Sequence, residues 1–289
     1  MKDDILSILE EKDPTFSKGQ RRIAAYITES YDKAAFMTAS RLGKAVGVSE
    51  STVVRFAVEL GFDGYPEMQK AMQEMVMNRL TSVQRMEIAN DRIGSGDILS
   101  KVLQADADKI RQTGETVSRE HFQKAVDAIL NARRIYLIGV RSTAPLANFA
   151  GYYMNYMFDN VQIITTSGAG EMFESLVNLN STDVVLAFSF PRYSSAVVKA
   201  AQYCRNVGAT VIAVTNSNLS PLGENSDYVL AAKSDMVSFV DSLVAPLSVV
   251  NALLVALASA REQTVQKSFE TLERVWEEYN IYEKRVDNL

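Results

Sequence analysis

The sequence predicts two domains of different class: an all-α helix-turn-helix domain, followed by an α/β domain with a five-stranded parallel sheet. Three observations predict this division. Residues 40–57 have the pattern of two short helices joined by a glycine turn. Beyond residue 120, five short apolar runs alternate with helical stretches. Between these regions, residues 75–119 are polar and helix-prone.

The chain is long enough for two domains, with 289 residues of which 47% are hydrophobic and 22% are charged. Its one cysteine, Cys204, excludes an intramolecular disulfide and gives no pair of metal ligands, so we expect no metal and no cofactor. The first residues are too acidic and polar for a secretory signal. These features favour a cytoplasmic protein.

The first helix of the helix-turn-helix is predicted over the residues that precede Gly47. We expect Leu42, Ala45 and Val46 to pack inward, because they share one helical face. Gly47 supplies the conformational freedom for a sharp turn. Ser49 suits the N-cap of the second helix.

The second helix carries the groups that are suited to reading DNA. We expect Val53, Val54 and Ala57 to face the core. Short hydroxyls at the start of a recognition helix reach phosphates and base edges, and an arginine one turn later suits a purine edge or a phosphate. The outward residues are Glu50, Ser51, Thr52 and Arg55, and the cap residue Ser49 is a further candidate for a DNA contact. The alternative is an ordinary helical hairpin in which Ser49 is only a cap.

Two flanking segments support the DNA-binding interpretation. Upstream, Ser17 suits the N-cap of a supporting helix, and downstream the turn at residues 61–68 brings in two aromatic side chains. Residues 14–78 thereby resemble the N-terminal domain of the RpiR family of bacterial transcriptional regulators, which implies a double-stranded DNA operator as partner. The exposed basic candidates are Lys18, Arg21, Arg22, Arg41 and Lys44.

The charge of this region is modest for a DNA-binding domain. Residues 17–60 carry seven basic and four acidic side chains, and the whole chain has a net charge of −5. The affinity for DNA should therefore depend on two copies of the domain acting together. We expect a homodimer or a homotetramer.

The predicted domain boundaries are residues 1–78 for the helix-turn-helix domain, 79–119 for a helical linker, 120–260 for the α/β domain and 261–289 for a C-terminal amphipathic helix. The linker is interrupted at residues 93–97, where Gly94 and Gly96 precede a new helix start. The apolar runs are rich in Val and Ile without strict alternation, which predicts strands buried on both faces. They cover residues 134–139, 161–165, 183–189, 210–215 and 228–231.

Two loops are predicted at the carboxyl ends of these strands, where ligands of parallel sheets bind. Residues 139–145 and 189–195 each lead from a strand into a helix and combine hydroxyls with an arginine. Backbone N–H groups at a helix start and a fixed positive charge both suit an anion. Ordinary capped turns with solvated arginines are the alternative. The candidate residues are Gly139, Arg141, Ser142, Thr143, Ser189, Arg192, Tyr193 and Ser194.

The α/β region resembles the sugar isomerase (SIS) domain, which binds phosphosugars in isomerases and in regulators of the RpiR family. The first loop of that domain commonly reads Gly-x-Gly-x-Ser. Here Gly139 matches the first glycine, Arg141 replaces the second, and Thr143 stands where the serine would be.

The second loop of the SIS domain commonly reads Ser-x-Ser-Gly-x-Thr. Ser189 and Ser194 match its ends, whereas Pro191 and Arg192 replace the middle pair. Losing a glycine restricts close approach of the backbone to a phosphate, while an added arginine supplies a bidentate clamp. The resemblance implies a sugar phosphate as ligand, with a sugar acid or another carboxylate as second choice. Glu171 is a candidate partner for the hydroxyls of the sugar.

Enzymatic isomerisation of a sugar requires a positioned acid or base. The single histidine, His121, precedes the sheet, and Glu171 and Glu174 lie on a predicted helix where carboxylates are common without a catalytic role. We therefore expect no catalytic residue. A phosphosugar isomerase with an accessory DNA-binding domain, and a DNA-organising protein with a vestigial α/β half, remain the alternatives.

Residues 242–260 form an uncharged run of nearly membrane-spanning length. Pro246, Ser248 and Asn251 favour a helix that is buried or lies at a subunit contact, so we expect no membrane partner. The amphipathic helix that follows packs on its own domain or crosses to a second subunit. In the expected mechanism, anion binding moves helices at a subunit contact and changes the affinity for DNA in either direction.

Overall fold

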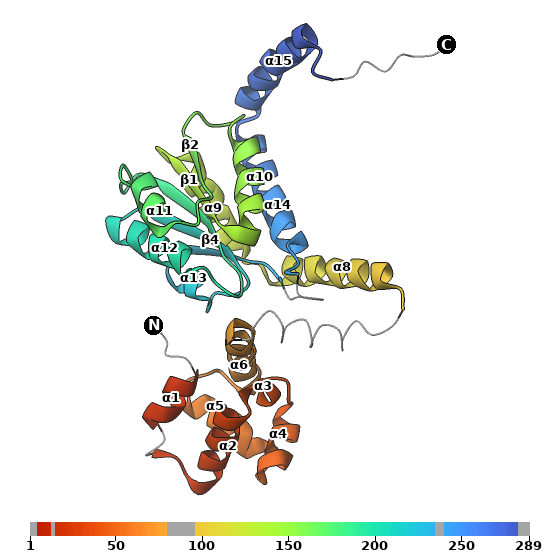
Figure 1. Ribbon diagram of the computed structural model, residues 1–289, viewed down its shortest axis with the longest axis vertical. Coiled ribbons are helices and arrows are strands. Elements are labelled where there is room, and N and C mark those ends of the chain that lie inside the picture. Colours follow the sequence, from red (N-terminus) through yellow and green to blue (C-terminus); the bar gives the residue numbers. More distant parts are fainter. Residues whose placement is uncertain (1–4, 13–14, 80–95, 235–239, 283–289) are drawn as a thin grey trace. The chain divides into compact units, whose positions relative to one another are not determined.

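The computed structural model describes residues 5–12, 15–79, 96–234 and 240–282. The chain divides into two compact units, residues 1–91 and residues 92–289, which are described separately below. The first is helical and the second contains a five-stranded parallel sheet (Figure 1). The predicted fold class is confirmed.

The described part of the N-terminal unit consists of helices packed around one apolar core. Its largest fully buried side chains come from four different helices, so each helix contributes one face to the core. The helices are α1 (Ile5–Lys12), α2 (Lys18–Glu29), α3 (Tyr31–Ala34), α4 (Ala39–Val46), α5 (Glu50–Glu59) and α6 (Tyr65–Arg79). The core includes Phe16, Ile23, Ile27, Leu42, Val53, Phe56, Met68 and Met72.

Local signals set the boundaries of these helices. Ser17 caps α2 in a reciprocal capping box with Gln20, as its hydroxyl accepts from the N–H of Gln20 and the side chain of Gln20 accepts from the N–H of Ser17. After α5, Gly61 adopts a φ of +97°, and the buried Phe62 and Tyr65 anchor the turn that leads into α6. The predicted supporting helix and aromatic turn are both present.

Two expectations about the inward faces were wrong. Ala45 is exposed, because the buried face of α4 is formed by Ala39, Leu42 and Gly43 instead. Val54 is 39% exposed, because α5 turns the face of Val53, Phe56 and Ala57 toward the core instead.

The sheet of the second unit has the strand order β2-β1-β3-β4-β5, and all its pairs are parallel. The strands begin or end within one residue of the predicted runs. They are β1 (Ile135–Gly139), β2 (Val161–Ile164), β3 (Val184–Phe188), β4 (Thr210–Thr215) and β5 (Tyr228–Ala231). Strands β1 and β3 are buried at every residue, as predicted, whereas β2 is largely accessible because it lies at the edge of the sheet.

Helices cover both faces of this sheet (Figure 1). One face packs against α9 (Arg119–Leu130), α10 (Ala144–Met154) and α14 (Val244–Ala260). The other packs against α11 (Ala169–Ser175), α12 (Ser195–Val207) and the short α13 (Pro221–Glu224). Alternate residues of each strand enter the two cores, which is the period of two expected for a strand between two helical layers.

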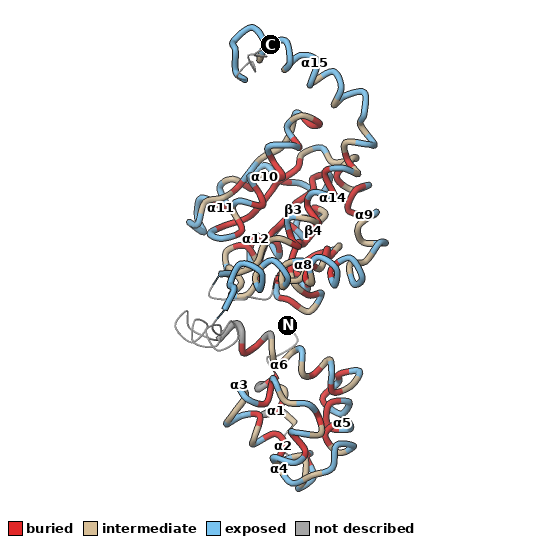
Figure 2. Tube along the Cα trace, turned by 90° about the vertical axis from the view of Figure 1, so that its right-hand side faces the viewer, coloured by how far each residue is buried: buried red, intermediate tan, exposed pale blue. Residues whose placement is uncertain are grey.

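Two further helices extend from this α/β layer structure. Helix α8 (Ile98–Thr116), whose N-cap is Asp97, packs against α14, although the sequence assigned its residues to the linker. Residues 93–95 of the predicted break lie outside the described residues. Helix α15 (Glu262–Tyr279) follows α14 and buries none of its residues, so it is exposed or intermediate along its whole length in Figure 2.

Candidate functional site

The turn between α4 and α5 has the geometry that the sequence predicts. Gly47 ends α4 with a φ of +71°, in the left-handed region that glycine favours. The N–H of Val48 donates to the carbonyl oxygen of Gly43 at 2.8 Å. A Cβ on Gly43 would lie 2.8 Å from the oxygen of Val48, so only glycine permits this close approach of the two helices.

The start of α5 carries a cluster of hydroxyl groups. Ser49 is the N-cap, and its Oγ accepts from the N–H of Thr52. The same Oγ lies 2.9 Å from Oγ of Ser51 and 2.8 Å from Oγ1 of Thr52. Glu50, Ser51 and Arg55 are exposed, with Nε of Arg55 donating to the carbonyl of Ser51 at 3.3 Å. These side chains therefore form one accessible patch at the first turns of α5.

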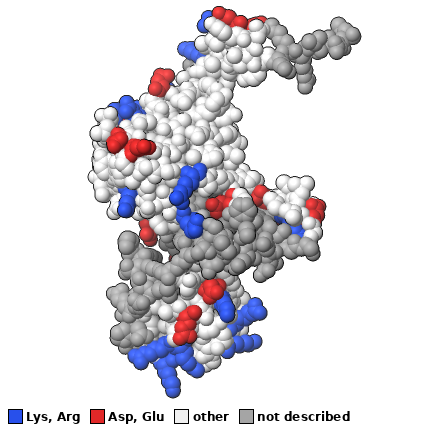
Figure 3. Space-filling model, in the orientation of Figure 1, with Lys and Arg blue, Asp and Glu red and all other residues white. Residues whose placement is uncertain are grey.

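The start of α2 lies beside this patch. A Cβ on Gly19 would contact Val48 at 3.5 Å and Thr52 at 3.8 Å. The guanidinium of Arg22 donates to the carbonyl oxygen of Gly47 at 2.9 Å, so this arginine also stabilises the turn. The candidate basic side chains are all exposed, and Lys and Arg side chains gather at the end of this domain opposite α6 (Figure 3). The five candidate basic residues are Lys18, Arg21, Arg22, Arg41 and Lys44.

In the α/β domain, the loop after β1 is organised by a buried threonine. Oγ1 of Thr143 accepts from the N–H of Val140 at 3.0 Å and lies 2.8 Å from the carbonyl oxygen of Val140. It also lies 3.2 Å from the carbonyl oxygen of Phe188, at the end of β3. The hydroxyl of Thr143 is thus used within the protein, where it joins two strand ends.

Two neighbours of Thr143, Arg141 and Ser142, remain accessible. Gly139 is buried, and a Cβ there would lie 2.7 Å from the carbonyl oxygen of Thr143. Arg141 and Ser142 are exposed, and Arg141 has a φ of +55°. Arg141 stands where the SIS pattern has its second glycine. Its positive φ is common for glycine but uncommon for any residue with a side chain. The loop therefore keeps a glycine-like path while presenting a guanidinium.

The loop after β3 contributes a second group of polar side chains. Ser189 is buried, and its Oγ accepts from the N–H of Ser194 at 3.2 Å. Ser194 is half-buried at the N-cap of α12, and its side chain makes no capping hydrogen bond. Arg192 is exposed, and the hydroxyl of Tyr193 donates to Oδ1 of Asn216 at 2.7 Å.

Asn216 is a further candidate residue at this edge of the sheet, and the sequence analysis did not single it out. It follows β4 directly, so its position at a strand end was the signal that could have identified it. Glu171, the candidate from the region after β2, is exposed in the first turn of α11 and accepts a hydrogen bond from the hydroxyl of Thr166 in the loop before that helix. The structure thus joins the loops after β1, β3 and β4 directly, through Thr143 and Tyr193.

His121 and Cys204 are both part of the internal structure of the α/β domain. Nδ1 of His121 accepts from the N–H of Val229 at 3.0 Å, and the ring packs edge-on against Tyr228. Cys204 is buried, which raises the pKa of its thiol to about 12. Within the described residues, no three side chains of His, Cys, Asp or Glu are grouped so that they could hold a metal ion.

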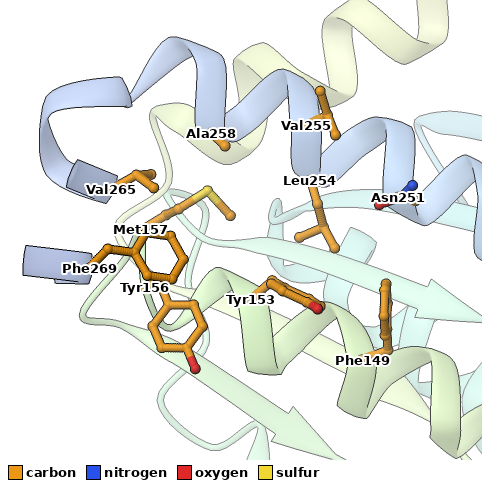
Figure 4. A pocket seen from close by; sticks show the side chains of 10 residues that line it. All are labelled: Phe149, Tyr153, Tyr156, Met157, Asn251, Leu254, Val255, Ala258, Val265 and Phe269. Atoms are coloured by element: carbon orange, nitrogen blue, oxygen red, sulfur yellow. The ribbon is translucent and has the colours of Figure 1, made fainter. Parts of the chain in front are cut away.

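An apolar cavity of about 250 Å³ lies away from the strand-end loops, between α10, α14 and α15 (Figure 4). Aromatic rings dominate one wall, where Tyr156 packs against Phe269 with their centroids 5.3 Å apart. Its lining residues are Phe149, Tyr153, Tyr156, Met157, Asn251, Leu254, Val255, Ala258, Val265 and Phe269. Such a lining suits an apolar partner and not a sugar phosphate.

Among the described residues, no single helix is long and apolar enough to cross a membrane. Helices α14 and α15 reach that length and hydropathy only as a pair bent by 96°. The inner face of α14 is buried against the sheet, where it supplies Val249, Val250, Leu253 and Leu257 to the core.

Comparison with protein families assigns both domains. Residues 3–79 match the model of the helix-turn-helix domain of the rpiR family, and residues 128–256 match the model of the SIS domain. The chain belongs to the RpiR family of transcriptional regulators. The similarity to one relative spans both domains. The chain is 25% identical over 280 residues to the HTH-type transcriptional regulator HexR of Escherichia coli, and the match covers 94% of each chain.

Two further matches cover nearly the whole chain and the α/β domain, respectively. An uncharacterised HTH-type transcriptional regulator of Caldanaerobacter subterraneus is 24% identical over 278 residues, which is 94% of this chain and 96% of the relative. The sugar isomerase domain of an RpiR transcription factor from Sphaerobacter thermophilus is 27% identical with a TM-score of 0.58, over 61% of this chain and 97% of that one.

A full-length structural neighbour is the NanR protein of Vibrio vulnificus, whose structure is a complex with ManNAc-6P. It is 23% identical with a TM-score of 0.58, and the match covers 94% of this chain and 98% of NanR. The likeness shows that the two chains share their fold.

Proposed function

We propose that this RpiR-family regulator binds a double-stranded DNA operator through α5 and the start of α2, and that a sugar phosphate controls the strength of this binding. The accessible hydroxyl patch at the start of α5, flanked by basic side chains, supports the DNA contact. We further propose that the protein works in the cytoplasm and catalyses no reaction.

The observation that carries the ligand proposal is the joining of two strand-end loops by Thr143. The two loops that meet at this junction carry Arg141 and Ser142 in the first and Arg192 and Ser194 in the second, which leads into the start of α12. A helix start and two arginines favour a phosphate or a carboxylate. The complex of NanR with ManNAc-6P supports a phosphorylated sugar over a sugar acid.

A second copy of the chain completes the proposal. A recognition helix gains affinity when two copies meet two half-sites. The exposed apolar side chains at the cavity or next to it, including Tyr152, Tyr153, Val255 and Phe269, are suited to a contact between two subunits. A dimer or tetramer built on α10, α14 and α15 would hold two reading domains together.

Two arginine variants test the proposal. The DNA probe is a duplex selected by the wild-type protein from a random-sequence library. The ligand probes are glucose 6-phosphate, glucosamine 6-phosphate, N-acetylmannosamine 6-phosphate and 6-phosphogluconate, with gluconate as the unphosphorylated acid. Arg55→Ala should weaken operator binding and leave the ligand-induced shift in Tm unchanged. Arg192→Ala should lose that shift and leave operator binding unchanged.

Matched controls remove exposed cations elsewhere. Lys33→Ala on α3 and Arg274→Ala on α15 should resemble the wild type in both assays. If Arg192→Ala keeps a normal response to all five compounds, the assignment of this loop is wrong. A wild-type protein that selects no duplex, or ignores every compound, overturns the proposed function.

A further inference from the structure

Three hydrogen bonds, connected by the peptide bonds between adjacent residues, lead from the loop after β3 to helix α8. In the first, the hydroxyl of Tyr193 donates to Oδ1 of Asn216 at 2.7 Å. The residue before Asn216 is Thr215, whose carbonyl oxygen accepts from the N–H of Ala232 at 2.8 Å. These bonds connect the ends of β3, β4 and β5.

The final bond reaches α8. The N–H of Lys233 donates to Oγ1 of Thr113 at 2.9 Å, and Thr113 lies in the last two turns of α8. Three of the bonded residues are almost inaccessible to solvent, with exposed fractions of 0% for Thr215, 1% for Ala232 and 4% for Thr113. Buried hydrogen bonds are costly to break without replacement. A displacement of Tyr193 should therefore displace the residues bonded beyond it, up to Thr113, more readily than it breaks these bonds. We call the residues Tyr193, Asn216, Thr215, Ala232, Lys233 and Thr113 the relay.

Helix α8 is fixed to the α/β domain at a second point. Oδ1 of Asp106 accepts from the hydroxyl of Ser242 at 2.7 Å and pairs with Nζ of the buried Lys109 at 3.2 Å. Helix α8 also packs against α14, beside whose first turn it lies in Figure 1. Helix α8 is the first described element after the N-terminal domain along the chain, so its position limits the positions that this domain can adopt.

We propose that the relay couples anion binding at the loop after β3 to the position of α8, and through α8 to operator affinity. The inference rests on the proposed function and adds the route of its regulation. Tyr193 is the end that meets the ligand, and Thr113 is a positioning residue that touches neither ligand nor DNA. Coupling between two sites requires an element whose arrangement both sites bias, and α8 is that element.

The test compares three variants of the full chain. Thr113→Val keeps the shape of the side chain and removes the acceptor for the N–H of Lys233, whereas Thr113→Ser keeps the acceptor. Thr116→Val is the matched control, since Thr116 is an exposed residue of the same helix. Its hydroxyl donates to the carbonyl oxygen of Gln112, which also belongs to α8. Operator affinity is measured with and without the sugar phosphate that raises the Tm of the wild type most.

In the wild type, the ratio of the two operator affinities should be about five-fold or more, the usual lower range for coupled sites. Thr113→Val should reduce that ratio to less than about two-fold while binding the sugar phosphate and the free duplex as the wild type does. Thr113→Ser and Thr116→Val should keep the wild-type ratio.

A second variant keeps the relay testable if the Thr113→Val protein does not fold. Tyr193→Phe removes the donor at the other end of the relay, and it should also lower the affinity ratio because the Asn216 contact is lost. A full ratio in both Thr113→Val and Tyr193→Phe overturns the relay and leaves the proposed function intact. A wild type without any ligand response overturns the proposed function and the relay with it.

Discussion

In the N-terminal domain, most candidate DNA-contacting side chains project into solvent, and other residues of the same helices form the core. In the α/β domain, by contrast, several candidate ligand-binding side chains are buried and form hydrogen bonds within the protein. Arg55 and Lys44 are exposed on α5 and α4. Thr143 and Ser189 are buried and bond to the backbone. Substitutions of exposed side chains such as Arg55 and Lys44 should therefore separate function from stability, whereas substitutions of buried ones such as Thr143 and Ser189 should change both.

The largest expected effect falls on a buried carboxylate at the amino end of the sheet. The side chain of Asp183 is fully buried and accepts from Nε and Nη2 of Arg133 and from the N–H of Asn180. Asp183→Ala should lower the free energy of unfolding of the α/β domain by about 3 kcal/mol, because three hydrogen bonds are lost. Urea denaturation followed by circular dichroism measures this change.

The exposed pair of Glu120 and Lys124 on α9 is the control, since both side chains are at least half exposed. Glu120→Ala should leave the denaturation curve unchanged. Equal effects of the two substitutions would contradict the importance of burial.

A smaller loss is expected at the junction of the strand-end loops. Thr143→Val should destabilise the α/β domain by about 2 kcal/mol, because the buried N–H of Val140 loses its acceptor. The exposed neighbour gives the contrast, as Ser142→Ala should change stability by less than about 0.5 kcal/mol. Thermal unfolding of the two variants measures the difference, and a stable Thr143→Val protein would show that the hydroxyl is not needed for the fold.

A pair of buried tyrosines extends the comparison to both domains. The hydroxyl of Tyr65 donates to the carbonyl of Met37 at 2.7 Å, whereas within the described residues the buried hydroxyl of Tyr136 has no hydrogen-bond partner. Tyr65→Phe should cost about 1 kcal/mol, and Tyr136→Phe should gain about as much, because it removes an unsatisfied group. Denaturation of both variants checks these opposite signs; a loss at Tyr136 would mean that its hydroxyl has a partner.

The smallest predicted difference concerns two helix caps. Ser49 accepts from the N–H of Thr52, whereas the side chain of Ser194 makes no capping bond. Ser49→Ala should destabilise the N-terminal domain by about 1 kcal/mol, and Ser194→Ala should leave stability unchanged but weaken sugar phosphate binding. Thermal unfolding with and without the sugar phosphates checks both. A normal ligand response of Ser194→Ala would exclude its hydroxyl from the site.

Local sequence patterns were sufficient to predict the main helices and strands and to recognise the family. Ser17, Gly47 and Ser49 set helix boundaries through contacts within a few residues, and the apolar runs located all five strands of the described sheet. These signals are short-range, so they can be read from consecutive residues. The inward faces were less certain, as Ala45 and Val54 illustrate, because burial depends on which neighbour covers a helix.

The sequence by itself therefore determined the two-domain fold class, the strand-end position of the candidate loops and the exposure of the basic residues around α5. Only the tertiary structure decided that Thr143 joins two strand ends, that Tyr193 bonds to Asn216, and that Thr113 on α8 bonds to Lys233. The physical reason is distance along the chain. These partners lie 23 to 120 residues apart, and a hydrogen bond between them exists only after the strands have been ordered in the sheet.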